Sequence, residues 1–238
     1  MNEKPEILSF SSADDLARAA ATAWQNAIEI ANRMGKLHCA ALSGGRITQK
    51  FFTFFVEQSR LRNISYTDVH FFWADERCVP PTDPESNFKM ADELLFKPLN
   101  ISAGNIHRLR GELPPAEAVK IAEAEFNKYL PDKAFDLIFL GMGEDGHIAS
   151  LFPNSSDKFL DTSAPFIVVE NSPKPPPTRI SLSYQTIFKA KNITVLVSGA
   201  GKENAFRESL SPDGKTPLAR ILQGNSAKVK VLSDIKVF

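Results

Sequence analysis

Short apolar runs alternate with segments of helical periodicity along most of this 238-residue chain. The pattern is clearest near the start, where predicted helices over residues 12–34 and 47–60 flank an apolar run at 36–42 and a Ser-Gly-Gly turn. Apolar strands that alternate with helices are typical of a parallel sheet with both faces covered. The sequence therefore predicts an α/β fold, with a mostly parallel central sheet and helices on both faces in a Rossmann-like arrangement.

The alternation continues without an internal repeat of fixed period or a linker of different composition. Further strands are predicted at residues 69–73, 105–109, 135–140, 166–170, 193–198 and 229–233, and further helices at 86–97, 115–130, 183–191 and 202–210. We expect one domain over residues 1–238, with residues 150–180 as a candidate small subdomain. Ligands of open α/β sheets bind beyond the carboxyl ends of the strands, so the segments that follow the strands are the candidates for a site.

Charge and hydropathy argue against several classes of function. Lys plus Arg number 28 and Asp plus Glu number 28, and this balance disfavours broad binding to nucleic acid or to an anionic membrane. No window approaches about 18 consecutive apolar residues, and the first residues lack the pattern of a secretory signal. We expect a cytoplasmic protein with reduced thiols; a monomer is favoured, although the sequence leaves the oligomeric state open.

The side chains that most often bind metals are widely spaced. No pair of the type His-x-x-x-His or Cys-x-x-Cys occurs among His38, Cys39, His70, Cys78, His107 and His147. The neighbours His38 and Cys39 would point to opposite faces of a strand and could not easily share one ion. We therefore expect neither a metal nor a cofactor.

A glycine-rich segment follows the most apolar of the predicted strands. Residues 141–147 read GMGEDGH, and their glycines allow tight backbone conformations that place Asp145 and His147 at the end of that strand. Imidazole is the side chain best suited to proton transfer near neutral pH, and a nearby carboxylate can orient it or bind a substrate hydroxyl. This segment predicts acid–base chemistry centred on His147.

Three further segments follow predicted strands, and each has both a structural and a functional interpretation. Ser43-Gly44-Gly45 provides either a tight turn or an anion site made of backbone N–H groups at a helix start. Asp75 and Arg77 form either a surface ion-pair cluster or part of a site, and Lys202 and Arg179 are either solvated charges or phosphate ligands. Together the four segments predict an anionic, hydroxylated small molecule as ligand.

At this point the order of the motifs resembles the 6-phosphogluconolactonase family. The resemblance covers residues from about 40 to 205, and it rests on Leu42-Ser43-Gly44-Gly45, Trp73-Ala74-Asp75-Glu76-Arg77 with Ser86-Asn87-Phe88, the run from Leu140 to Pro153, Arg179-Ile180-Ser181-Leu182 and Gly199-Ala200-Gly201-Lys202. The most specific part is the segment GMGEDGHIASLFP. Members often follow the glycine pair with Ser-Thr-Pro, whereas this chain has Arg46-Ile47-Thr48, so Arg46 either supplements the anion site or points to solvent.

The resemblance implies hydrolysis of 6-phospho-D-glucono-1,5-lactone to 6-phosphogluconate in the oxidative pentose phosphate pathway. It implies His147 as the general base that activates water, and Asp145 as its orienter or as a contact for a sugar hydroxyl. Asp75 and Arg77 would contact the lactone end or stabilise the oxyanion. The sugar-phosphate substrate would further be bound by Ser43, Gly44, Gly45, Asn87, Arg179 and Lys202. A lactone is an activated ester, so this hydrolysis requires neither a metal nor a covalent nucleophile.

Two other functions remain open at this stage. Glucosamine-6-phosphate deaminases continue a similar loop with Phe-Asn-Glu-Pro, whereas this chain has Ser150-Leu151-Phe152, so the acidic residue of the deaminases is missing there. A sugar-phosphate sensor would need an attached DNA-binding module, and we expect no segment of that size. A sensor would bind 6-phosphogluconate without accelerating loss of the lactone.

Overall fold

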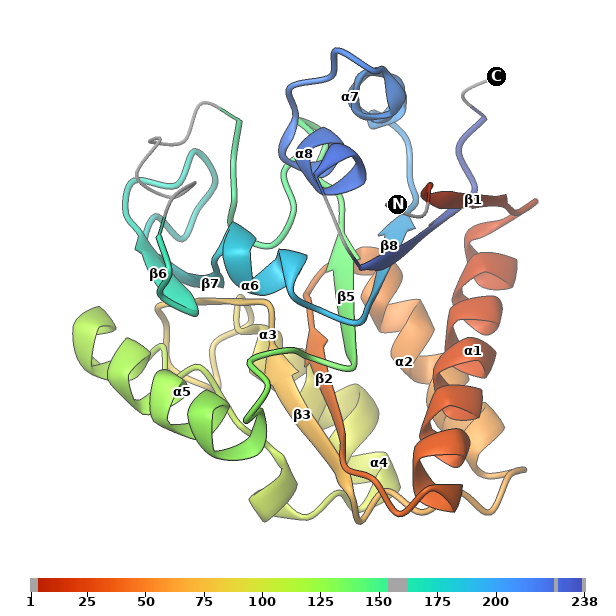
Figure 1. Ribbon diagram of the computed structural model, residues 1–238, viewed down its shortest axis with the longest axis vertical. Coiled ribbons are helices and arrows are strands. Elements are labelled where there is room, and N and C mark those ends of the chain that lie inside the picture. Colours follow the sequence, from red (N-terminus) through yellow and green to blue (C-terminus); the bar gives the residue numbers. More distant parts are fainter. Residues whose placement is uncertain (1–3, 154–161, 225–226, 237–238) are drawn as a thin grey trace.

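The central sheet of the computed structural model consists of six parallel strands in the order β1-β9-β8-β5-β2-β3 (Figure 1). The structure describes residues 4–153, 162–224 and 227–236. The strands are β1 (Glu6–Ser9), β2 (His38–Leu42), β3 (Val69–Trp73), β5 (Leu137–Gly141), β8 (Asn192–Val197) and β9 (Lys228–Ser233). The predicted mostly parallel α/β fold is confirmed, although the sequence pattern did not reveal β1.

A second sheet has three antiparallel strands in the order β4-β7-β6. These strands are β4 (Asp75–Arg77), β6 (Phe166–Val169) and β7 (Arg179–Leu182). The single residue Ala74 joins the two sheets, because its N–H donates to the Leu42 carbonyl of β2 and its carbonyl accepts from the Leu182 N–H of β7. The chain therefore passes from β3 of the first sheet directly into β4 of the second.

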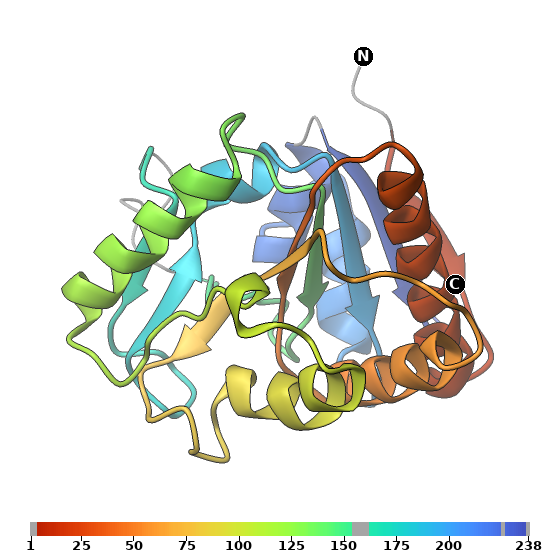
Figure 2. The same ribbon diagram turned by 90° about the horizontal axis from the view of Figure 1, so that it is seen from below.

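Helices lie on both sides of the parallel sheet, with α1 and α2 packed together on one side and α6 on the other (Figures 1 and 2). The α-helices are α1 (Ala13–Arg33), α2 (Arg46–Ser59), α3 (Asn87–Ala91), α4 (Lys97–Leu99), α5 (Pro115–Tyr129), α6 (Tyr184–Phe188), α7 (Glu203–Leu210) and α8 (Pro217–Gln223). Ser12 begins α1 by accepting a hydrogen bond from the Asp15 N–H, as predicted from its position. Among the described residues, no helix is long and apolar enough to span a bilayer.

Aromatic side chains fill the space between these two helices and the sheet. Trp24 of α1 lies within 4.6–5.7 Å, between ring centroids, of Phe51 and Phe55 of α2 and of Phe139 of β5. All four side chains are buried. Burying each large apolar side chain contributes roughly 1.5–3 kcal/mol, so this cluster is a major reason why α1 and α2 cover that face.

Two predicted elements differ from the structure. Residues 105–109 do not form a strand: a 3-10 helix (Ala103–Asn105) precedes a single parallel bridge between Ile106 and Phe71. Residues 86–97 are helical as predicted, but a π-helical turn (Asp92–Phe96) interrupts them between α3 and α4. The single domain and its candidate subdomain at 150–180 stay predictions, and residues 154–161 of that subdomain lie outside the described residues.

Strand order locates the position of a ligand site. β3 lies on one side of β2 in the sheet, and β5, β8 and β9 follow on the other side. The connections therefore reverse between the neighbours β2 and β5, and the crevice at the carboxyl ends of such a pair is where ligands bind in open α/β sheets. The Ser-Gly-Gly turn follows β2, and the GMGEDGH segment begins at the last residue of β5.

Candidate active site

A pocket of about 280 Å³ opens at the carboxyl ends of β2 and β5. Eight of the residues predicted for the site line it: Ser43, Gly44, Gly45, Asp75, Arg77, His147, Arg179 and Lys202. A larger pocket of about 450 Å³ lies beside Phe88 and Phe96, but its lining contains none of the predicted catalytic groups. The smaller pocket is therefore the candidate active site.

His147 and Asp145 form a hydrogen-bonded pair at this site. Nδ1 of His147 lies 2.5 Å from Oδ1 of Asp145, and the His147 N–H donates to the same oxygen at 3.3 Å. Burial by itself would raise the pKa of Asp145, but the hydrogen bond and charge of His147, together with the charge of Lys174, lower it to about 2. Asp145 is thus a carboxylate, which keeps the proton of the imidazole on Nδ1 and leaves Nε2 as the basic nitrogen.

Gly143 has no side chain, and the His147–Asp145 pair occupies the space that a side chain would fill. A Cβ placed on Gly143 would lie 2.1 Å from both Nδ1 and Cε1 of His147 and 2.7 Å from Oδ1 of Asp145. The Gly143 N–H also donates to the His147 carbonyl at 2.9 Å, which closes the turn. Glycine at this position therefore permits the imidazole to lie against the loop.

Replacing Gly143 with alanine should disturb this pair. We expect the turnover number to fall about tenfold, because the new methyl group displaces the imidazole and misplacement of a catalytic group slows the reaction strongly. The measurement is steady-state hydrolysis of the proposed lactone substrate. Gly104→Ala is the matched control, since a Cβ there meets its nearest heavy atom at 3.8 Å. Equal turnover of Gly143→Ala and the control would contradict the geometry described.

The Ser-Gly-Gly turn directs the start of α2 into the pocket. Gly45 is the N-cap residue of α2, and its φ of 112° lies in a region that favours glycine. Ser43 is buried and donates to the Phe139 carbonyl at 2.8 Å, which ties the end of β2 to β5. The N-terminus of α2 therefore lies at the pocket, and an anion site made of its backbone N–H groups stays a prediction.

Cationic side chains converge on the same pocket. Lys202 precedes α7, and burial lowers its pKa, as do the nearby charges of Arg46 and Lys174, against the opposing effect of Glu144. Arg46 and Lys174 line the pocket together with Lys202. Arg46 is exposed and lines the pocket, so a role of its side chain in binding an anion stays a prediction. Cations that repel one another in a pocket favour an anionic ligand between them.

Asp75 is held deep in the pocket wall. Its Oδ2 accepts a hydrogen bond from the Ser150 hydroxyl at 2.7 Å, and the Asn87 amide donates to its carbonyl at 2.9 Å. Asn87 is buried and packs directly against Gly44, where an added Cβ would lie 1.9 Å from Asn87 Oδ1. These contacts position Asp75, and the substrate contact expected of Asn87 stays a prediction.

Glu76 fastens β4 to the start of α3. Its buried carboxylate accepts from the N–H groups of Arg77, Asn87 and Phe88 at 2.7–2.8 Å and from the Ser86 hydroxyl at 3.0 Å. Burial raises the pKa of Glu76, and the three backbone hydrogen bonds oppose that effect. Glu76 thus points away from the pocket and explains how Asp75 and Asn87 are brought together.

Arg77 and Arg179 lie opposite each other in the antiparallel pairing of β4 with β7. Nη1 of Arg77 donates to the Glu85 carbonyl at 2.6 Å, whereas its buried Nε has no hydrogen-bond partner among the described residues. Arg179 is buried, and its Nη1 lies 4.0 Å from Oδ2 of Asp75. Arg77 lines the pocket, and the substrate contact expected of it stays a prediction.

Sequence reasoning missed several residues of the lining. Lys174, Glu144 and Ser198 line the pocket, although only the segment around Glu144 had been singled out. Lys174 belongs to a proline-rich loop between β6 and β7, which do not end at this edge of the central sheet. Its only signal in the sequence is a lysine in a stiff loop just before Arg179.

Comparisons with known proteins show the family of the chain. The family model described as glucosamine-6-phosphate isomerases/6-phosphogluconolactonase matches residues 11–231. The chain belongs to this family. The 6-phosphogluconolactonase of Haemophilus influenzae is 38% identical over 82% of this chain and 81% of its own length, and that of Treponema pallidum is 36% identical over 75% of each. The resemblance inferred from the motifs is confirmed.

Solved structures share the architecture across nearly the whole chain. The 6-phosphogluconolactonase of Trypanosoma brucei is 27% identical, with a TM-score of 0.81 over 97% of this chain and 96% of that one. A monomeric glucosamine-6-phosphate deaminase has a TM-score of 0.79 at 18% identity over 96% of each chain. At that identity the second likeness shows the fold alone.

Proposed function

We propose that this family member hydrolyses 6-phospho-D-glucono-1,5-lactone to 6-phosphogluconate, the second step of the oxidative pentose phosphate pathway. One observation carries the proposal: His147, which is paired with Asp145, lines the same pocket as the convergent cations Arg46, Lys174 and Lys202. A phosphorylated ester needs both a base for water and cations for its phosphate. The names of the curated relatives support the same activity.

In the proposed reaction, His147 acts as the general base. Nε2 takes a proton from a water molecule while the water oxygen attacks the lactone carbonyl carbon, whose oxygen becomes the oxyanion of a tetrahedral intermediate. The intermediate then collapses: the bond from the carbonyl carbon to the ring oxygen breaks, and the imidazolium returns its proton to that oxygen. The Asp145 carboxylate stabilises the imidazolium between these steps.

The two ends of the substrate would contact different parts of the pocket. The phosphate would lie at the N-terminus of α2 on the N–H groups of Gly44 and Gly45, beside Lys202 and Arg46. Asp75 and Arg77, which line the pocket, would contact the lactone end of the substrate. The substrate is a small-molecule sugar phosphate, and a cytoplasmic monomer stays the expectation.

Hydrolysis of the freshly generated lactone tests this function. The purified protein should accelerate loss of the lactone well above the spontaneous rate, with and without a chelator such as EDTA. No three His, Cys, Asp or Glu side chains in residues 4–153, 162–224 and 227–236 are grouped to hold a metal ion, and the lactone carbonyl is already electrophilic. Binding of 6-phosphogluconate without acceleration would indicate a sensor. Activity lost on chelation and restored by zinc or magnesium would contradict the metal-free mechanism.

A further inference from the structure

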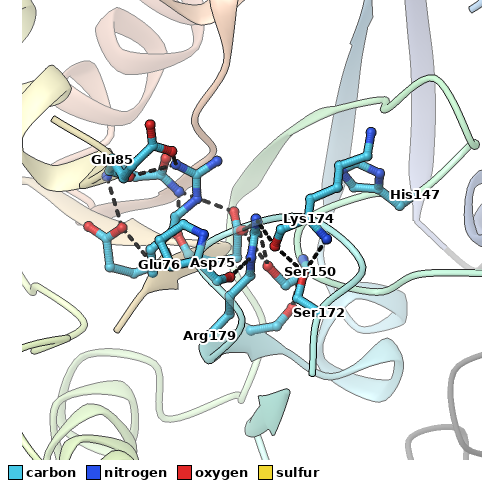
Figure 3. Close-up of polar contacts among 12 residues, drawn as sticks. Asp75, Glu76, Glu85, His147, Ser150, Ser172, Lys174 and Arg179 are labelled. Atoms are coloured by element: carbon cyan, nitrogen blue, oxygen red, sulfur yellow. Dashed lines mark hydrogen bonds and ion pairs between the residues drawn. The ribbon is translucent and has the colours of Figure 1, made fainter. Parts of the chain in front are cut away.

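One cation reaches the acid–base pair from the second sheet. Lys174 lies in the loop between β6 and β7, yet its Nζ is 3.9 Å from Oδ1 of Asp145. Figure 3 shows its side chain extending from the loop toward His147. Asp145 Oδ1 already accepts from the ring and the backbone of His147, and 3.9 Å is too long for a further hydrogen bond. The ammonium group therefore keeps donors free beside the reacting base.

The backbone that carries Lys174 is held by partly buried hydrogen bonds from Ser172 and Arg179 (Figure 3). The guanidinium of Arg179 donates to three successive carbonyls, those of Lys174 at 3.1 Å, Pro175 at 3.0 Å and Pro176 at 3.1 Å. The Ser172 hydroxyl donates to the same Lys174 carbonyl at 2.8 Å and accepts from the Lys174 N–H at 3.3 Å. The Arg179 side chain is only 4% exposed, and its guanidinium group holds this loop in place.

We propose that Lys174 is a further catalytic residue, whose ammonium donates to the carbonyl oxygen of the lactone as that oxygen becomes negative, and that Arg179 is the positioning residue that holds it there. The proposal rests on the proposed lactonase function. Its geometric basis is that Lys174 lies beside the base that activates water, so its ammonium is near the carbon under attack. A donor positioned before the reaction stabilises the developing charge without reorganisation.

This assignment separates Lys174 from the other cations of the pocket. Lys202 and Arg46 lie at the starts of α7 and α2, where backbone N–H groups also favour a phosphate. Lys174 instead contacts the carboxylate of the acid–base pair. The alternative is that Lys174 is a third phosphate ligand, which would make its removal act on phosphate recognition rather than on turnover.

The test compares Lys174→Met and Lys174→Arg with the wild-type protein. We expect Lys174→Met to lower kcat roughly 10²-fold, the usual effect of losing one oxyanion donor, with KM within about threefold. Lys174→Arg keeps the charge and should recover at least part of the loss. Lys189→Met, which removes an exposed lysine from the end of α6, is the matched control and should leave both constants unchanged.

The outcomes distinguish the proposals from each other. If the wild-type protein does not hydrolyse the lactone, the proposed function fails. The catalytic assignment of Lys174 is wrong if the wild-type protein is active and Lys174→Met has a normal kcat. It is also wrong if Lys174→Met binds 6-phosphogluconate more weakly than the wild-type protein but binds gluconate equally well. A loss of kcat with selective phosphate recognition intact supports it.

The positioning role of Arg179 has a separate test. Arg179→Lys keeps the charge but loses the planar fork that binds the three loop carbonyls. We expect its kcat to fall, and the double variant Lys174→Met/Arg179→Lys to be no slower than the slower single variant, because Arg179 acts through Lys174. Losses that multiply in the double variant would overturn this coupling, and a thermal melt of each variant checks that the fold persists.

Discussion

Asparagine in place of His147 is expected to slow lactone hydrolysis roughly 10²–10⁴-fold, the usual contribution of a positioned acid–base group. Asparagine keeps a hydrogen-bond donor near Asp145 but has no basic nitrogen comparable with Nε2 of imidazole. The fold should persist, because His147 lies in the loop after β5 and is not part of the buried apolar core. The measurement is the catalysed rate after subtraction of spontaneous hydrolysis.

Binding of the product provides the control for this variant. His147→Asn should bind 6-phosphogluconate about as well as the wild-type protein, because the proposed phosphate contacts lie on Gly44, Gly45 and Lys202. An unchanged thermal melt would show that the rate loss is not caused by unfolding. Near wild-type hydrolysis by His147→Asn would remove His147 from the mechanism.

Alanine in place of Lys202 is expected to weaken binding of 6-phosphogluconate by roughly 1.5–3 kcal/mol, or about 10- to 150-fold in Kd. The partly buried ammonium would form a charge-assisted hydrogen bond to the phosphate in a site where Arg46 and Lys174 already repel it. Gluconate, which lacks the phosphate, should bind the variant with little change. Isothermal titration calorimetry with both ligands measures the difference.

The phosphate experiment includes a control variant, Lys215→Ala, and a second test variant, Arg179→Ala. Lys215→Ala removes an exposed lysine between α7 and α8 and should leave both affinities unchanged. The sequence predicts that Arg179→Ala causes the same selective loss as Lys202→Ala, whereas the hydrogen bonds of Arg179 to the proline-rich loop favour a loss for both ligands. Equal losses of the two ligands in Lys202→Ala would make Lys202 structural rather than phosphate-binding.

Local sequence patterns were sufficient to predict most strands of the parallel sheet and the turns that follow them. Apolar runs located β2, β3 and β5, because a parallel strand buried on both faces is a short continuous apolar run. β8 and β9 were also located, although β9 alternates lysine with valine at its start and is exposed there. Glycines after β2 and β5 marked the turns that present Gly44, Gly45 and His147. Strand ends of a parallel sheet share one edge, so these residues could be predicted to meet before the fold was seen.

Elements with weak local patterns were harder to predict. The exposed strand β1 has no buried face to reveal it, and its four residues are stabilised by parallel pairing with β9. The apolar character of residues 105–109 predicts a strand, but only Ile106 bridges to β3. In both segments, backbone pairing with residues distant in the sequence decides whether a strand forms, and local β-propensity does not reflect such pairing.

The charged groups that share the pocket with His147 could not be predicted from local patterns, because long-range strand pairing brings them together. The pairing of β4 with β7 sets Arg77 opposite Arg179, although about a hundred residues separate them in the sequence. Through the carbonyls bound by Arg179, the same sheet brings Lys174 to within 3.9 Å of Asp145. The sequence around a charged residue does not show whether its side chain is solvated or buried in a site. Its role depends on neighbours supplied by long-range strand pairing, which the antiparallel sheet provides here.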